Sequence, residues 1–368
     1  MENKKELWSL FTAKHEYDSG IRDKYNRHPF YLSRNRNVFH PSVSDYLLRN
    51  GLQPTYPDNK KFAICLTHDV DYLYHNQYLK TLPRHMIDGT KSLLSLNYKA
   101  FKNTLSSVLN NEIHTSKRNV VVRRNSDWSV SKTLDFEKKY NAKSTFYFLS
   151  LSEGEQGFNY NLSDIKDVLQ EMEFSNCEIG LHGGHLAYNN LNKLKDEKQK
   201  LESILNKKIT GYRNHYLRFE TPKTWEILEQ LNFKYDTTFG YADCVGFRNG
   251  MCHPFQPYSN NNNTFLNIIE LPLIIMDNTM SKYMNLDVKQ QFEICKNLID
   301  TVENHNGVLT FLWHNTEMTD AQGEFYNAFL KYAYEKNAWL ASANEIINWW
   351  QENDFIEKSK NIFEQLKH

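Results

Sequence analysis

The sequence predicts an α/β fold built on a parallel sheet, either open or closed into a barrel. Short apolar runs of strand length alternate with amphipathic helical patterns from residue 61 onward, which is typical of repeated strand–helix–strand units. Polar clusters directly follow several of these runs, as expected where the carboxyl ends of parallel strands build a site. The predicted strands are residues 62–66, 144–149, 177–181, 209–212, 235–237, 268–275 and 308–313.

Two of the intervening helices have clear sequence signals. Thr221 and Pro222 are the expected N-cap and first-turn proline of one helix, and apolar residues follow at helical spacing. In residues 191–205, leucine and isoleucine line one face, while lysine and glutamate occupy the other. Both patterns indicate helices that pack one face against a sheet.

The chain divides into a barrel domain with an addition at each end. Residues 1–60 are polar and aromatic with weak periodicity and four prolines, and we interpret them as a small N-terminal extension. The barrel-like domain is expected over residues 61–350, interrupted by a helical insertion at 74–127. Residues 351–368 are expected to form a C-terminal helical tail.

The composition excludes several classes of protein. Lys plus Arg and Asp plus Glu both number 44, and this balance argues against a nucleic-acid binder. Mean hydropathy is −0.68, and no apolar run approaches the ~20 residues of a membrane span, so no transmembrane segment is expected. The first residues lack a signal-peptide pattern, and the five cysteines are scattered without a Cys-x-x-Cys pair. We therefore expect a cytoplasmic protein.

Five polar clusters lie at the carboxyl ends of predicted strands. Chance would scatter such residues among helices and loops, whereas the ends of parallel strands meet at one face of a sheet or barrel. We therefore expect the clusters to build one site. They are Thr67-His68-Asp69-Val70-Asp71, His182-Gly183-Gly184-His185, Arg213-Asn214-His215-Tyr216, Asp236-Thr237-Thr238 and His314-Asn315.

Asp69 and Asp71 in the first cluster should project to the same side, because alternate residues of a strand face the same way. His68 should face away from them. Two carboxylates this close repel each other unless a cation or a proton relieves them. Histidines at neighbouring strand ends complete the ligand set of a catalytic zinc or similar divalent ion with an open position for water.

With these motifs in this order, the sequence resembles the polysaccharide deacetylases, the chitooligosaccharide-deacetylase homology group also called carbohydrate esterase family four. The resemblance covers residues 61 to about 345 and implies a distorted (β/α) barrel of about seven parallel strands with one divalent metal, expected to be Zn²⁺. The motifs that carry it are Thr67-His68-Asp69-Val70-Asp71, Ser144-Thr145-Phe146-Tyr147-Phe148, Glu178-Ile179-Gly180-Leu181-His182-Gly183-Gly184-His185, Arg213-Asn214-His215-Tyr216, Asp236 and Leu312-Trp313-His314.

The resemblance implies a metal held by one aspartate and two histidines. The first motif departs from the family pattern, because Val70 separates its two aspartates. We therefore assign the ligand role to Asp71 and the general-base role to Asp69. His182 is the expected second ligand.

The third ligand is His215 or His185. The histidines of the second motif are three residues apart instead of the family's four, although residues at that spacing can still share a face. His215 replaces a proline of the family and should face the same side as Arg213. We expect only one of the two to bind the metal, with His215 slightly favoured.

The remaining site residues follow from the same resemblance. Arg213 is expected to keep the general base ionised, and His314 to protonate the departing amine. Asp236 is a candidate to orient His314 or to tune its charge. Tyr216 and Trp313 are expected to face the substrate.

The function expected from this resemblance is a metal-dependent hydrolase of carbon–nitrogen bonds. It would remove an N-acetyl group from a sugar in a precursor of a bacterial surface polysaccharide, because the first and third motifs resemble that branch of the family. Two alternatives follow from the altered motifs and from the site chemistry. One is a non-catalytic carbohydrate-binding or scaffold protein on a degenerate barrel, and the other is an esterase or amidase for a different acyl substrate.

Overall fold

The computed structural model describes residues 4–17, 19–35, 37–73, 129–175, 177–317 and 320–367. The helical insertion predicted at 74–127 lies outside the described residues. Within the described part of the chain, no helix has both the length and the apolar character required to cross a membrane.

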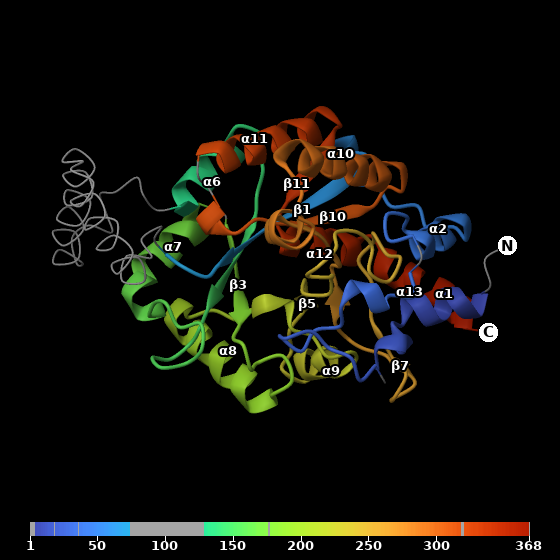
Figure 1. Ribbon diagram of the computed structural model, residues 1–368, viewed down its shortest axis with the longest axis horizontal. Helices are drawn as coiled ribbons and strands as arrows, with labels where there is room; N and C mark the ends of the chain where they lie inside the picture. The colour runs from blue at the N-terminus through green and yellow to red at the C-terminus, as the bar shows by residue number, and fades with distance from the viewer. Residues whose placement is uncertain are drawn as a thin grey trace, which may run out of the picture.

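A curled sheet of parallel strands forms the centre of the molecule (Figure 1). Its strands follow one another in the order β8-β5-β4-β3-β2-β1-β10-β9, and β11 pairs with the first half of β1. Most strand residues are buried on both faces, which explains why the strands are continuous apolar runs in the sequence. The strands are β1 (Phe62–Val70), β2 (Thr145–Leu149), β3 (Glu178–Gly183), β4 (Gly211–Asn214), β5 (Tyr235–Asp236), β8 (Ile269–Glu270), β9 (Leu273–Met276), β10 (Val308–Leu312) and β11 (Ala338–Ala341).

The two ends of this sheet are successive pieces of one chain segment. The strand predicted at 268–275 is split at Leu271 and Pro272, so that β8 pairs with β5 and β9 pairs with β10. Proline lacks the N–H that a continuous ladder would need at this point. When β8 and β9 are counted as one interrupted strand and β11 is left aside because it lies off the main path, seven strands follow one another around the sheet, which confirms the predicted α/β barrel-like architecture.

Helices surround the sheet, as Figure 1 shows. Helices α8, α10 and α12 begin at side-chain caps; the Asp287 side chain, for example, accepts a hydrogen bond from the backbone N–H of Gln290 at the start of α10. The helices of the barrel and tail are α6 (Ser129–Lys138), α7 (Lys166–Phe174), α8 (Leu191–Leu205), α9 (Lys223–Gln230), α10 (Val288–Asn304), α11 (Asp320–Glu335), α12 (Ala343–Glu352) and α13 (Phe355–Lys367).

Thr221 does not cap α9 as predicted. The helix begins at Lys223 without a side-chain cap, and the Thr221 hydroxyl instead donates a hydrogen bond to the Glu16 carboxylate. Because Glu16 belongs to the segment before the barrel, this bond attaches that segment to the residues just before α9. A long-range contact therefore replaces the local one that the sequence predicts.

The segment before the barrel lies against the barrel and its C-terminal tail. It contains α1 (Lys4–Phe11), α2 (Ser42–Arg49) and the short helical turns η1 (Lys14–Glu16), η2 (Phe30–Leu32) and η3 (Pro57–Asn59). Helix α1 lies beside α13, so the two chain ends are on the same side of the molecule (Figure 1). The rings of Phe11 and Phe363 stack with centroids 3.8 Å apart at this contact.

Candidate metal centre

Three side chains from neighbouring strands converge in a nearly equilateral triangle. His182 Nε2 lies 3.1 Å from His215 Nδ1 and 3.2 Å from Asp71 Oδ1, and the His215 Nδ1 to Asp71 Oδ1 distance is also 3.2 Å. Donor atoms bound tetrahedrally to Zn²⁺ at ~2.0–2.1 Å are about 3.3 Å apart. One carboxylate and two imidazoles at this spacing fit a divalent metal ion, and we call these three residues the triad.

The strand order brings the triad together. Asp71 directly follows β1, His182 is in β3 and His215 directly follows β4, and all three strands run in the same direction. The ring of His182 is oriented by its Nδ1–H, which donates a 3.0 Å hydrogen bond to the carbonyl oxygen of Arg213. This bond leaves Nε2 free to bind a metal, as in many metal sites.

A strained turn places His215. It begins the turn η5 (His215–Leu217), in which Tyr216 and Leu217 have φ values of 61° and 52°. Residues other than glycine rarely adopt this left-handed conformation, which costs of order 1 kcal/mol or more at each position. The surrounding structure holds the chain in this shape, and the His215 ring thereby points at Asp71.

The charges within the triad support binding of a cation. Burial raises the pKa of the Asp71 carboxyl, but the charges of His215 and His182 and their hydrogen bonds outweigh burial and hold this pKa well below its usual range. Burial lowers the pKa of His182, but Asp69 and Asp71 raise it above its ordinary value. The negative charges of Asp69 and Asp71 therefore favour a proton on His182, and the same charges would stabilise a metal ion bound by the triad.

Asp69 lies next to the triad, on the same side of β1 as Asp71. Its Oδ2 is 3.6 Å from His182 Nε2, and its Oδ1 is 3.6 Å from Nη1 of Arg213. Arg213 is held by hydrogen bonds from Nε to Thr237 and from Nη2 to Thr67. Within the described part of the chain, Asp69 Oδ1 and Arg213 Nη1 are buried without a hydrogen-bond partner, so both can bind a water or substrate atom.

His314 follows β10 and also reaches the triad. Its Nε2 is 3.9 Å from Asp71 Oδ2, and its Nδ1 forms a 2.7 Å hydrogen bond with Asp277 Oδ1. The other carboxylate oxygen of Asp277 accepts a 2.7 Å hydrogen bond from the backbone N–H of His314. Burial lowers the pKa of His314, but Asp277 more than compensates and raises it to about 10.

Asp236 does not orient His314, which corrects the prediction. Its hydrogen bonds go to Thr238 and to the carboxyl of Glu270, because β5 lies across the sheet from β10 and next to β8. Burial raises the pKa values of both Asp236 and Glu270, and the two groups share a proton. Asp277, which the sequence analysis missed, takes the predicted place beside His314.

The sequence does contain a feature that indicates Asp277 as a site residue. It directly follows the apolar residues of β9, just as Asp71 follows β1. The prediction of one strand over 268–275 placed no cluster at this end, because the break at Pro272 was not recognised. If β9 is treated as a separate strand, the expectation that site residues follow the carboxyl ends of strands identifies Asp277.

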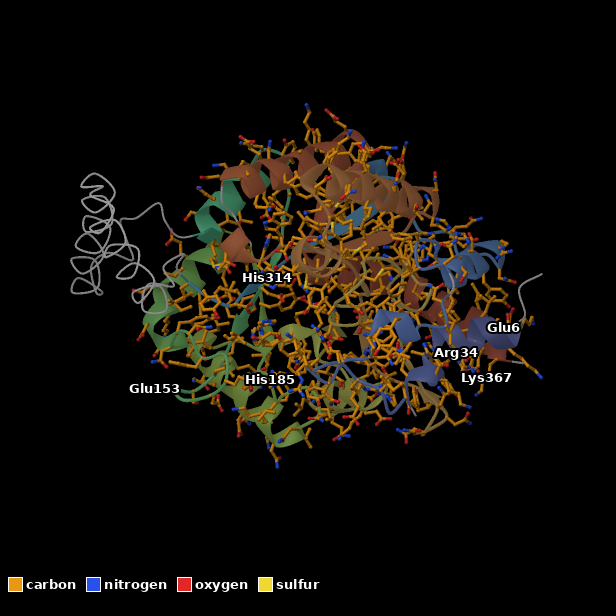
Figure 2. The ribbon with its side chains drawn as sticks, in the orientation of Figure 1. Glu6, Arg34, Glu153, His185, His314 and Lys367 are labelled. Carbon is orange, nitrogen blue, oxygen red and sulfur yellow. The ribbon has the colours of Figure 1, made fainter. Side chains whose placement is uncertain are left out.

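His185 is separate from the triad. The ring is half-buried and meets the ring of Tyr216 edge-on, with centroids 5.6 Å apart. Burial and the charge of Arg218 lower the pKa of His185. Figure 2 shows that His185 is well separated from His314, which reaches the triad. Of the two alternatives for a third ligand, the structure brings His215 to Asp71 and His182.

The two aromatic residues predicted to face the substrate lie in different surroundings. Tyr216 is 38% exposed beside the ring of His215, and its own ring stacks on Tyr25 of the N-terminal extension at 4.8 Å. Trp313 does not face the substrate, because it is fully buried and stacks on Phe325. Trp313 precedes His314, so its side chain points to the opposite face of the strand end.

His68 faces away from Asp69, as the alternation along β1 predicts. Its Nδ1 donates a hydrogen bond to the carbonyl oxygen of Trp313, and its Nε2 lies 2.9 Å from the Glu137 carboxylate. Tyr326 also donates to Glu137. The buried network of His68, Glu137 and Tyr326 therefore ties together the ends of β1 and β10, which carry Asp69 and His314.

Comparisons with known proteins identify the fold. No protein-family model and no curated protein matches the sequence. Among solved structures, a protein from Mycobacterium smegmatis assigned as a polysaccharide deacetylase is 14% identical, with a TM-score of 0.53 over 82% of this chain and 94% of that one. PuuE allantoinase is 12% identical, with a TM-score of 0.54 over 83% and 96% of the two chains.

A third structure supports the same result. A protein from Pseudomonas aeruginosa PAO1, assigned as a polysaccharide deacetylase, is 13% identical, with a TM-score of 0.51 over 83% of this chain and 97% of that one. At these identities the likeness concerns the fold. It confirms that this chain has the polysaccharide-deacetylase fold that its motifs predict.

Proposed function

We propose that this protein is a metal-dependent hydrolase that removes an N-acetyl group from a sugar. The observation that carries the proposal is the triad of Asp71, His182 and His215 with Asp69 and His314 both next to it. A metal site, a candidate base and a candidate acid within one strand-end cluster are the parts that amide hydrolysis requires.

The metal, which we expect to be Zn²⁺, would be bound by the triad, where it supplies a Lewis acid and lowers the pKa of a bound water. Asp69 accepts the proton of the attacking water, and the Arg213 guanidinium lies 3.6 Å from this carboxylate and balances its negative charge. His314 donates a proton to the departing amine. Asp277 holds His314 in its protonated form at neutral pH, which suits a general acid for a basic leaving group.

The substrate class in this proposal is a carbohydrate. The exposed ring of Tyr216 stands beside His215 and offers an aromatic surface at the edge of the site. Arg27 of the N-terminal extension donates a 2.9 Å hydrogen bond to the carbonyl oxygen of Tyr216, so the extension helps to shape this edge. We place the reaction on a surface-polysaccharide precursor in the cytoplasm, and the five cysteines, all buried and free, agree with a reducing compartment.

The test is deacetylation by the chain after a chelator has removed its metal. Reloading with Zn²⁺ should restore the release of acetate and of free amine from N-acetylated sugar oligomers. The matched variant is Asp69→Asn, which should bind as much metal as the wild type but release no acetate, because an amide cannot accept the water's proton. Loss of one bound metal from Asp69→Asn, with the full wild-type metal content retained in Asp71→Asn, would reverse the two assigned roles.

The same assay separates this proposal from its alternatives. Oligomer binding without acetate release in the metal-loaded protein would indicate a non-catalytic carbohydrate-binding protein. Release from an acetyl ester alone would indicate an esterase. Because an allantoinase has the same fold, allantoin belongs in the substrate panel, and its exclusive hydrolysis would indicate an amidase for a small cyclic substrate.

A further inference from the structure

A second cluster of histidine and aspartate lies outside the site described above. His40 and Asp45 belong to the N-terminal extension, and His305 ends helix α10 of the barrel. His305 Nε2 is 2.9 Å from Asp45 Oδ1, and His40 Nε2 is 3.0 Å from Asp45 Oδ2. One ligand atom from each of the three residues lies within 4.8 Å of the others, as in the triad.

The ring of His305 is held in one orientation. Its Nδ1 lies 2.6 Å from the carbonyl oxygen of Thr301, in the last turn of α10. A carbonyl oxygen only accepts hydrogen bonds, so the hydrogen of a neutral His305 ring is on Nδ1. Nε2 of that ring then carries a lone pair, in the arrangement in which protein carbonyls orient metal-binding histidines.

This lone pair faces a carboxylate oxygen of Asp45, so a proton or a metal ion must lie between the two atoms. Asp45 Oδ1 only accepts hydrogen bonds, and the 2.9 Å distance to His305 Nε2 would otherwise bring two lone pairs into contact. Either a second proton or a metal ion can occupy this position.

We propose that His40, Asp45 and His305 form a second binding site for a divalent transition-metal ion such as Zn²⁺. Two imidazoles and one carboxylate are a common zinc ligand set, and water can complete the coordination because the His40 and Asp45 side chains are 43% and 33% exposed. The bound ion would link the N-terminal extension to α10, and it would act on stability and not on the reaction. This inference does not depend on the proposed function.

A third cluster is unsuited to a cation, because its carboxylate is already paired with an arginine. His15, Glu16 and His28 also bring ligand atoms within 4.8 Å of one another. Both carboxylate oxygens of Glu16, however, accept hydrogen bonds from Arg248, whose charge opposes a cation there. Asp45 instead pairs with two imidazoles, His305 at Oδ1 and His40 at Oδ2.

The experiment measures bound zinc per chain in the full-length protein after chelator treatment, titration with Zn²⁺ and removal of free ion. The decisive variant is His40→Gln, because its side-chain amide can still donate a hydrogen bond to Asp45 but is a poor zinc ligand. His305→Asn is the second variant, since its amide can replace the Nδ1–H bond to Thr301. Each variant should bind one zinc fewer than the wild type, with unchanged hydrolytic activity.

The melting temperature measured with and without Zn²⁺ shows whether a metal ion or a proton lies between Asp45 and His305. Saturating Zn²⁺ should raise the melting temperature of the wild type more than that of His40→Gln, because the ion binds only the folded site. Equal zinc content in the wild type and His40→Gln would overturn the proposal and leave a proton between Asp45 and His305. An Asp71→Asn protein that binds no zinc at all would overturn it as well, since this cluster remains intact in that variant.

Discussion

Asp71 and Asp236 both stand at strand ends of the same sheet, and their neighbours move their pKa values in opposite directions. Two imidazoles face Asp71 and hold its pKa well below the usual range against the effect of burial. Burial raises the pKa of Asp236, whose carboxyl shares a proton with Glu270. Chemically identical groups therefore serve different purposes, because one offers negative charge to a cation and the other shares a proton with a neighbouring carboxyl.

The largest expected effect is the difference between two single variants, each with one of these aspartates replaced by asparagine. Asp71→Asn removes a charged ligand and should abolish the metal bound by the triad, so that the protein binds one zinc fewer than the wild type, and should reduce the rate roughly a thousandfold or more, since a catalytic metal contributes several kcal/mol. Asp236→Asn replaces a carboxyl that bonds to Thr238 and Glu270, away from the triad, by an amide of the same shape and should keep both metal and activity. Metal analysis and acetate release test the pair, and equal losses in the two variants would contradict the comparison.

His314→Ala should have the next largest effect, and this effect should depend on the substrate. Removing a general acid costs on the order of 10²–10⁴ in rate when an amine must be protonated as it leaves. The loss should be much smaller for an activated acetyl ester, whose leaving group departs without a proton. The measurement is kcat on both substrates; equal losses would leave His314 with a positioning role only.

Asp277→Asn changes the neighbour of His314 and should shift the pH dependence of the reaction. The Asp277 carboxylate stabilises the protonated ring, so its removal lowers the pKa of His314 from about 10. The ring then loses its proton at lower pH, and the alkaline limb of the pH–rate profile should move down by more than ~1 pH unit. The profile is measured on metal-loaded protein, and an unmoved alkaline limb in this variant would exclude His314 as its source.

Glu270→Gln should have the smallest effect, which concerns stability and not activity. The folded protein raises the pKa of Glu270, so this group contributes most below its unfolded value near 4.5 and contributes less as the pH rises. Each pH unit in that range lowers the free energy of unfolding by on the order of 1 kcal/mol, and the glutamine variant should not show this decrease because its side chain does not ionise. Urea unfolding from pH 5 to 8 should show a flatter dependence for Glu270→Gln; parallel curves would mean that Glu270 is ionised in the folded protein.

Much of the site could be predicted because strand geometry is local. The alternation of side chains along β1 places Asp69 and Asp71 together and His68 on the other face, and this needs only consecutive residues. The same rule would have placed Trp313 opposite His314, in the core where the structure has it. Its prediction as a substrate contact failed because aromatic character was given more weight than strand parity.

Other features depend on which strands become neighbours, and this information is not local. Asp236 was predicted to meet His314, but the order of strands around the sheet gives that place to Asp277. The choice between His185 and His215 depends on the turn at Tyr216, whose left-handed backbone the surrounding packing imposes on ordinary residues. No pattern of hydrophobicity or spacing in the chain indicates that conformation.

The break between β8 and β9 also bears on how the molecule avoids aggregation. One short segment around Leu271 and Pro272 supplies both ends of the sheet, so the ends are joined by covalent bonds and not by a ladder of hydrogen bonds. If the chain were cleaved there, β5 and β10 could each lose their outer partner and expose unpaired backbone groups. Such edges recruit strands from other molecules, so the covalent link through Leu271 and Pro272 helps to keep both ends of the curled sheet covered.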